Sequence, residues 1–146
     1  MGLIEAVCIS ADKGVIKIPL NEITLRVGWG IEGDAHAGEW HRQVSLLAGE
    51  SIDRMREKMP EIDHGMFAEN IVTRGIDFSG LSVGDSLNIG DDVVLEITQI
   101  GKECHNSGCA IKVATGECIM PKEGLFCRVL QGGTIVPGMA VKIDAE

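Results

Sequence analysis

Short runs of apolar residues, separated by glycine-rich turns, fill most of this chain. A period of two between apolar and polar positions is typical of a strand with one buried face, and Ile23, Leu25 and Val27 follow it. The 19 glycines are spread over the whole length, as expected for many strands joined by tight turns. The pattern predicts strands at Ile4–Ser10, Val15–Pro19, Glu22–Val27, Gln43–Ala48, Glu69–Thr73, Ser86–Ile89, Val93–Ile100, Thr134–Val136 and Ala140–Ile143.

One segment, Glu50–Met59, has a helical period instead. Its apolar positions recur at i, i+3 and i+7, with charged residues between them. Ser51 is a candidate cap at its start, and Pro60 marks its end. Strands spread evenly around one or two short helices favour a mainly β fold, a barrel or rolled sheet, over a doubly wound one. We therefore expect residues 1–146 to form a single domain of this class.

Composition and charge narrow the function classes. Aromatic residues make up 3% of the chain and tyrosine is absent, so the core is expected to be aliphatic. A formal net charge of -9 repels phosphate backbones and anionic lipids. We therefore expect neither nucleic acid nor a membrane as partner. A local basic pocket for a small anionic molecule remains compatible with this charge, because net charge does not describe a single cleft.

The cysteines and the N-terminus predict a cytoplasmic protein. Five cysteines are an odd number, and the first residues show no signal-peptide pattern. No apolar run reaches transmembrane length. Thiols stay reduced in the cytoplasm, so disulfides are not expected. Cys8 and Cys127 have apolar neighbours and are interpreted as small core residues.

The loop Gly28–Gly38 opens with the spacing G-x-G-x-x-G. That spacing binds a dinucleotide when the N-terminus of a helix follows it. Here the next residues include Asp34, His36 and Gly38, which favour a loop over a helix, and the acidic ones would face the phosphates. We interpret the segment as a loop shaped by its glycines rather than a nucleotide site.

Polar residues in and after this loop are candidates for ligand contacts. Asp34, His36 and His41 offer carboxylate and imidazole ligands to a metal such as zinc or iron, or else form an Asx turn and bond to the backbone. Arg42 is a candidate anion contact. The pair Glu69-Asn70 is either a set of hydrogen-bonding groups for a ligand or the cap of a turn.

Sulfur chemistry is indicated by the segment Gly101–Cys109. Cys104 has polar neighbours, with Lys102 two residues before it and His105 beside it, and nearby positive charge favours the nucleophilic thiolate. A structural zinc site is the alternative, although this spacing is not a recognised zinc pattern. Its four ligands would be Cys104, His105, Cys109 and Cys118.

In their order along the chain, these segments resemble the MOSC domain, named for the C-terminal domain of molybdenum cofactor sulfurase, and most closely its small stand-alone bacterial form. The resemblance covers nearly the whole chain. The segments that carry it are Gly30–Gly38, Gln43–Leu47 with the helix that follows, Phe67–Ile71, Val83–Asp85, Leu87–Gly90, Leu95–Gln99, Gly101–His105 and Cys118–Gly124.

The resemblance implies a MOSC-like β-barrel of mixed strands and a cysteine that carries sulfane sulfur or binds molybdenum. Cys104 matches that cysteine. Two features differ from larger members: Glu103 stands where they often have proline, and their N-terminal β-barrel domain is not in this sequence. The residues that match the family's pocket-forming loops are Asp34, His36, Arg42, Glu69 and Asn70.

The leading hypothesis is a sulfur carrier for the molybdenum cofactor (molybdopterin). A cysteine desulfurase, which holds its own pyridoxal phosphate, would supply sulfur to Cys104, and a molybdoenzyme or the cofactor would accept it. Lys102 and His105 would favour the thiolate, and Arg42 would meet the phosphate of the pterin. The alternatives are a non-catalytic module that binds molybdopterin or a partner enzyme, and the structural zinc protein.

Overall fold

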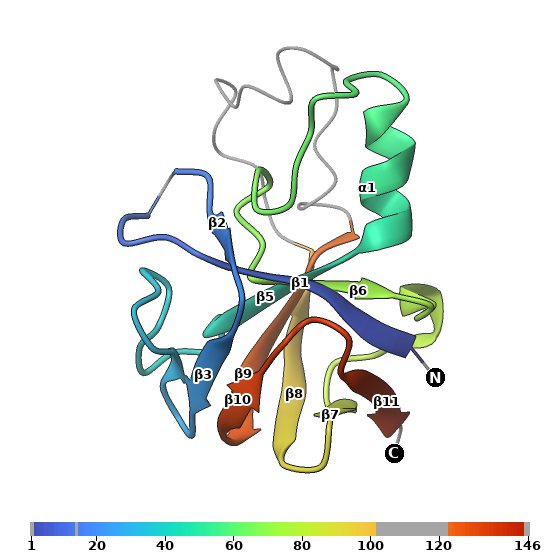
Figure 1. Cartoon of the computed structure of the whole chain (residues 1–146). Helices are drawn as coiled ribbons and strands as arrows, with labels where there is room; N and C mark the ends of the chain where they lie inside the picture. The colour runs from blue at the N-terminus through green and yellow to red at the C-terminus, as the bar shows by residue number, and fades with distance from the viewer. Residues whose placement is uncertain (1, 14, 102–122, 145–146) are drawn as a thin grey trace.

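The computed structural model describes residues 2–13, 15–101 and 123–144. Seven strands close into a mixed barrel in the order β11-β7-β8-β9-β5-β6-β1, with β11 paired back to β1 (Figure 1). The elements are β1 (Gly2–Ile9), β2 (Ile18–Leu20), β3 (Ile23–Arg26), β4 (Gly30–Ile31), β5 (Val44–Ala48), α1 (Gly49–Arg56), β6 (Ile71–Arg74), the 3-10 turn η1 (Phe78–Gly80), β7 (Ser86–Ile89), β8 (Val93–Ile100), β9 (Leu125–Gln131), β10 (Gly133–Ile135) and β11 (Ala140–Asp144).

The barrel is mixed because of one parallel pair. β5 and β6 run parallel, with Leu46 opposite Ile71, whereas the other strand pairs are antiparallel. Parallel neighbours need a long crossover, and α1 with residues 57–70 provides it. In Figure 1, α1 stands at the upper end of the barrel beside the end of β5. The predicted mainly β barrel with one or two short helices is confirmed, and the described residues include one α-helix, α1.

β1 takes part in more than the barrel wall. Its first residues pair with β11, and its last three, Val7 to Ile9, pair with β2. A separate small sheet, in the order β10-β3-β4, lies against the lower part of the barrel (Figure 1). Residues 32–43 connect β4 of this small sheet to β5 of the barrel. This loop therefore lies between the two sheets and near the end of β1.

Two apolar clusters fill the molecule. The larger occupies the barrel interior and includes Val7, Leu46 and Ile71. The smaller lies between the barrel and α1, and contains the next residue of each of those strands. β1, β5 and β6 are therefore buried on both faces, which explains the continuous apolar run of β5. The second cluster comprises Ala6, Cys8, Leu47, Ile52, Met55, Ile62, Phe67, Val72 and Phe126.

Two strand predictions need correction. Residues 15–17 of the predicted strand Val15–Pro19 precede β2, because Lys17 turns inward to an ion pair instead of joining the ladder. The strand β9 was not predicted, although it pairs with both β5 and β8. Its first three residues are all buried, so the alternation that identifies a half-buried strand is absent there.

The helix prediction is confirmed in position and wrong in its ends. α1 stops at Arg56, three residues before the predicted Met59. Ser51 does not cap it, because the N-cap position is Ala48, which has no side-chain hydrogen bond to the helix. The Ser51 hydroxyl instead donates to Glu123 at 2.9 Å. Within the described part of the chain, none of the helical segments has the length and apolar character that crossing a membrane requires.

Candidate functional site

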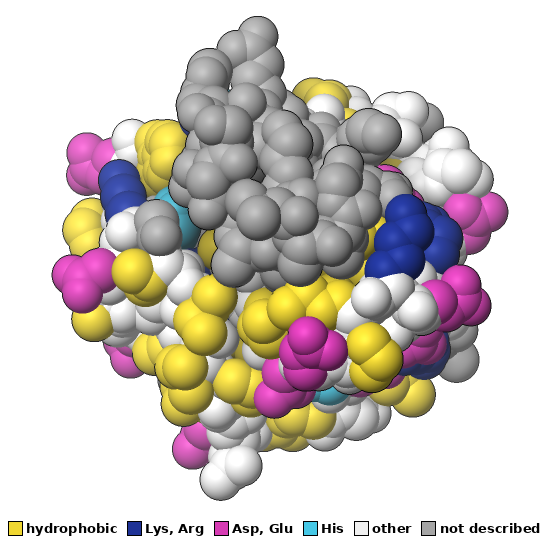
Figure 2. All heavy atoms as spheres, turned by 90° about the horizontal axis from the view of Figure 1, so that it is seen from above, with side chains coloured by type: hydrophobic (Ala, Val, Ile, Leu, Met, Phe, Trp, Pro, Cys, Tyr) yellow, Lys and Arg dark blue, Asp and Glu magenta, His cyan; other side chains and the backbone are white. Residues whose placement is uncertain are grey.

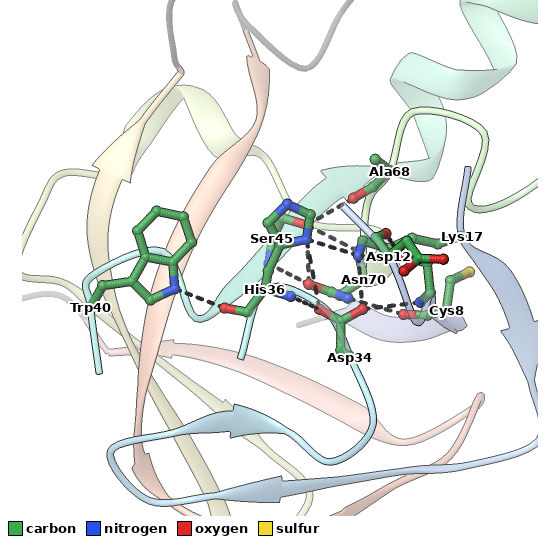
Figure 3. A network of polar contacts seen from close by, with 10 residues as sticks. Cys8, Asp12, Lys17, Asp34, His36, Trp40, Ser45, Ala68 and Asn70 are labelled. Carbon is green, nitrogen blue, oxygen red and sulfur yellow. Dashed lines mark hydrogen bonds and ion pairs between the residues drawn. The ribbon is translucent and has the colours of Figure 1, made fainter. Parts of the chain in front are cut away.

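The loop of residues 32–43 is anchored by the carboxylate of Asp34, whose side chain is fully buried. Asp34 Oδ1 accepts the backbone N–H of Ser10 at 3.1 Å, and Oδ2 accepts the backbone N–H of His36 at 3.0 Å (Figure 3). The second bond is the Asx turn that the sequence allowed. No helix follows the glycine-rich segment, so the interpretation as a loop rather than a nucleotide site is supported.

A buried lysine lies at the centre of this loop. Lys17 Nζ is 2.8 Å from Asp34 Oδ1, 3.1 Å from Ser10 Oγ and 2.9 Å from His36 Nδ1. Its side chain is 0% exposed, as is that of Asp34. Sequence reasoning missed Lys17. The available signal was a lone lysine inside an apolar run that was predicted to be a strand.

The Trp40 ring lies against His36 and also close to two cationic side chains, those of Lys13 and Arg42. The Trp40 and His36 rings are stacked at 6.5 Å between centroids, and Trp40 Nε1 donates to the His36 carbonyl at 2.7 Å. Lys13 Nζ lies 5.2 Å from the indole ring and Arg42 Cζ lies 5.1 Å from it. Sequence reasoning did not single out Trp40 or Lys13. Cation–π contacts leave no sequence motif, so nothing pointed to either residue.

Arg42 has no counter-ion within residues 2–13, 15–101 and 123–144. Its guanidinium is close to the rings of both Trp40 and Phe126, with Cζ 5.6 Å from the centre of the Phe126 ring. Arg42 Nε is buried and has no hydrogen-bond partner among the protein atoms. A buried donor without an acceptor costs roughly 1–3 kcal/mol, and more when charged. An anionic ligand would satisfy this donor, and the role of Arg42 as an anion contact stays a prediction.

The metal hypothesis for Asp34, His36 and His41 gains no support. His41 is turned to Gln99, with Nε2 2.7 Å from Gln99 Oε1. The carboxylate of Asp34 is already engaged by Lys17 and two backbone amides. Across residues 2–13, 15–101 and 123–144, no group of three or more metal-binding side chains is gathered.

Glu69 is completely buried and holds a turn. Its two oxygens accept the backbone N–H groups of Gly65 at 2.9 Å and Phe67 at 3.0 Å. Burial raises the pKa of the Glu69 carboxyl, and these hydrogen bonds oppose the rise. The contacts favour the turn cap over the ligand contact, the two interpretations that the sequence left open.

Asn70 joins three strands at the same place. Its Oδ1 accepts the backbone N–H of Ser45 at 3.0 Å, and its Nδ2 donates to the carbonyl of Cys8 at 3.1 Å (Figure 3). These bonds connect the start of β6 to β5 and β1. Asn70 therefore supports the floor beneath the loop of residues 32–43 through backbone groups.

The predicted chemistry of Lys102, Cys104, His105, Cys109 and Cys118 lies outside the described residues. The flanking residues are defined. Gly101 N donates to Gly124 O at 2.7 Å, so β8 ends where β9 begins. Phe126, two residues further, carries the ring that packs on Arg42 and is paired with Ser45 of β5. The Arg42 site thus adjoins the start of β9.

Surface charge around this end of the barrel is mixed. Figure 2 looks down on it and shows Lys and Arg side chains in small separate groups among acidic and hydrophobic ones. Lys17 is balanced by Asp34, whereas Arg42 has no acidic partner among the described residues. The positive charge available to a ligand is therefore local, in a chain whose net charge is -9.

Comparison with known proteins confirms the family resemblance. The family model of the MOSC domain matches residues 33–142. A protein named "Reductase" from Gibberella moniliformis is 28% identical over 130 residues, which cover 78% of this chain but only 22% of that protein. The chain thus spans about a fifth of this curated relative.

Two solved structures show the same fold. The YUAD protein from Bacillus subtilis is 19% identical, with a TM-score of 0.83 over 99% of this chain and 96% of that one. YiiM from Geobacillus stearothermophilus is 18% identical, with a TM-score of 0.69 over 96% of this chain and 73% of that one. At these identities the likeness concerns the fold alone.

Proposed function

Since the chain belongs to the MOSC domain family, we propose that it binds the molybdenum cofactor and transfers sulfur on its behalf. In this proposal Arg42 holds the phosphate of the pterin. Cys104 either accepts sulfane sulfur or ligates molybdenum through its thiolate. The family is linked to this cofactor. The resemblance of the segment Gly101–His105 to the family supports the role of Cys104.

The observation that carries the proposal is the buried Nε of Arg42, which has no hydrogen-bond partner among the described residues. Arg42 Cζ lies within cation–π distance of the Trp40 and Phe126 rings, and the N–H of Nε is left without a protein acceptor in the described part of the chain. A planar guanidinium donates in-plane hydrogen bonds to phosphate oxygens, and an aromatic environment strengthens them by excluding water. The residues present therefore fit an anionic ligand such as a pterin phosphate. When bound, the cofactor supplies a metal centre for redox and sulfur chemistry.

Sulfur would reach Cys104 by thiol exchange. The Cys104 thiolate attacks the outer sulfur of a persulfide on a cysteine desulfurase, and the donor cysteine leaves as a thiolate. The product is a persulfide on Cys104, with no net oxidation or reduction. Lys102 and His105 favour the attacking thiolate. Pyridoxal phosphate acts only in the donor enzyme.

The test of the proposal is retention of the pterin. Purified protein is incubated with molybdopterin extracted from a molybdoenzyme and passed through a desalting column, and the retained pterin is measured by fluorescence. We expect Arg42→Ala to lower affinity about tenfold or more, because a charge-assisted hydrogen bond is removed. Arg26→Ala is the matched control: this exposed arginine pairs with Glu32 at 3.8 Å, and its loss should change nothing. Equal retention by wild type and Arg42→Ala would contradict the proposal.

A non-catalytic binding module is the second candidate. It is favoured because the contacts of Arg42 and His36 are built from described residues and need no cysteine. Cys104→Ser distinguishes the two functions. Pterin retention that survives this substitution, with no sulfur transfer in wild type, supports the module. Loss of retention in Cys104→Ser excludes it and supports direct ligation of molybdenum.

A further inference from the structure

We propose that Lys17 is a positioning residue that fixes the tautomer of His36. In this arrangement His36 Nδ1 is an acceptor turned to Lys17, and Nε2 carries the proton as a hydrogen-bond donor. The proposal goes beyond the binding of an anion at Arg42, because it assigns a defined donor to the neighbouring imidazole. No motif in the sequence connects these two residues, which are 19 positions apart.

The directions of the surrounding hydrogen bonds support this assignment. The hydroxyl of Ser10 donates its single proton to the carbonyl of Asp12 at 2.9 Å, so toward Lys17 it acts as acceptor. Asp34 Oδ1 is an acceptor as a carboxylate. An ammonium has three N–H groups, and two of them are used in this way. The third is directed to His36 Nδ1 at 2.9 Å, which must present a lone pair.

The opposite tautomer conflicts with the same geometry. A proton on His36 Nδ1 would point at the ammonium of Lys17, 2.9 Å away, with no acceptor between them. Asp34 Oδ2 is 3.8 Å from Nδ1 and too distant for a hydrogen bond. It is already occupied by the backbone N–H of His36.

The ring is held in this orientation from several sides. Trp40 stacks on it with an interplanar angle of 11°, and Trp40 Nε1 bonds to the carbonyl of the same residue. The side chain of His36 is 29% exposed, whereas Lys17 and Asp34 are fully buried beneath it (Figure 3). The buried ion pair therefore sets Nδ1, the inner nitrogen of the imidazole, as an acceptor, so that the ring proton lies on Nε2.

Two groups that can interact with a ligand, an imidazole and a guanidinium, lie against Trp40. His36 stacks on the indole, and the guanidinium of Arg42 packs against it. An imidazole fixed as a neutral donor complements an anionic oxygen and would not repel the cation beside it. This functional use depends on the proposed function, whereas the tautomer itself does not.

The tautomer can be measured directly in the wild-type protein. In two-dimensional NMR of ¹⁵N-labelled protein without cofactor at neutral pH, the two ring nitrogens of a neutral histidine have distinct shifts. We expect His36 to show a protonated Nε2 and an unprotonated Nδ1, and His36→Gln identifies its signals. A proton on Nδ1, or an imidazolium, would overturn the proposal whatever becomes of pterin binding.

Substitution of Lys17 tests whether it is the cause. Lys17→Met should convert His36 to a mixture of tautomers with a clear Nδ1–H population. Lys13→Met, which removes another cation near Trp40 without a bond to His36, should leave the signals unchanged. If Lys17→Met does not fold, the double variant Lys17→Met/Asp34→Asn replaces it, because no unpaired charge is then buried. A pure Nε2–H form in the folded variant would show that Lys17 does not position the ring.

Discussion

The ion pair of Lys17 and Asp34 is unusual for a residue pair because both side chains are fully buried. Moving two charges out of water costs several kcal/mol per ion, and only good geometry with further hydrogen bonds offsets this. Here Lys17 Nζ lies within 3.1 Å of Ser10 Oγ, Asp34 Oδ1 and His36 Nδ1, and Asp34 accepts two backbone amides in addition. The pair therefore ties the segment before β2 to the loop of residues 32–43.

Removing one partner of this buried pair should destabilise the protein much more than removing one partner of an ion pair at the surface. We expect Asp34→Ala to lower the free energy of unfolding by about 3–5 kcal/mol, because the ammonium of Lys17 stays buried without compensation. The control Glu32→Ala in the same loop removes an exposed carboxylate and should cost no more than about 0.5 kcal/mol. Urea denaturation monitored by tryptophan fluorescence measures both. Equal stability of the two variants would contradict this view of the pair.

Glu69 gives the stability a specific pH dependence. Burial raises the pKa of its carboxyl in the folded protein above the ordinary value of 4.5, so the folded state binds the proton more tightly than the unfolded state. Stability due to this group should therefore be greatest at low pH and fall as pH rises from about 4.5 through the raised pKa. In Glu69→Gln that fall should be absent, as measured by urea denaturation at a series of pH values. A difference between the proteins that is constant with pH would refute it.

Some site residues follow from the sequence and others do not. Asp34, His36 and Arg42 combine chemically useful side chains with a glycine-rich loop, and the structure brings all three around Lys17 and Trp40. Lys17 and Trp40 were missed because their roles depend on burial and on ring contacts between segments that are distant in the sequence. The prediction for Cys104 stays a prediction.

At the scale of elements, the turn of residues 65–69 fits closely against the segment that carries Lys17. Gly65 has φ +90°, and a Cβ there would lie 2.0 Å from the carbonyl oxygen of Lys17. The backbones also bond, with Lys17 N donating to Gly65 O at 2.8 Å. This turn therefore supports the backbone that carries the buried lysine.

Gly65→Ala should lower the free energy of unfolding more than the same substitution at a turn with open space around it. Gly84 has a similar φ of +101°, with nothing within 4 Å of its would-be Cβ. Gly84→Ala measures the backbone strain alone, about 1–2 kcal/mol. Gly65→Ala adds a clash with backbone and should cost about 1–3 kcal/mol more in the free energy of unfolding. A smaller loss at Gly65 than at Gly84 would show that the turn moves freely.

Strands were predictable where one face is buried and the other is exposed to solvent. β8 alternates along most of its length and was found with its bounds unchanged. β9 begins with three buried residues and was missed, since the pattern that reveals a strand arises from contrast between its faces. α1 is shorter than its apolar period suggested. Its last turn gives way to a chain reversal in which Arg56 Nε donates to the carbonyl of Ile62.

At the scale of the whole molecule, closure of the barrel creates the site. The pairing of β5 with β9 brings Phe126 to Arg42, two residues separated by most of the chain. The pairing of β1 with β2 and β6 brings Lys17 beneath the loop that holds His36. Such contacts depend on topology, so a sequence pattern can indicate the barrel without indicating which loops meet.

The barrel also removes two cysteines from consideration as sulfur acceptors. Cys8 and Cys127 are fully buried, as predicted. Burial raises the pKa of the Cys8 thiol to about 12 and that of Cys127 still further from its ordinary value. Burial therefore disfavours the thiolate of both residues, and the thiolate is the reactive species. Any persulfide should therefore form on a cysteine between residues 104 and 118.

Sulfur transfer to Cys104 is tested most directly by intact mass spectrometry. The protein is incubated with a cysteine desulfurase and cysteine, and the mass is recorded for wild type, Cys104→Ser, and the matched controls Cys109→Ser and Cys118→Ser. We predict a gain of one sulfur atom in wild type and in both controls, and none in Cys104→Ser. An equal gain in Cys104→Ser, or no gain in wild type, would contradict a sulfur carrier built on this residue.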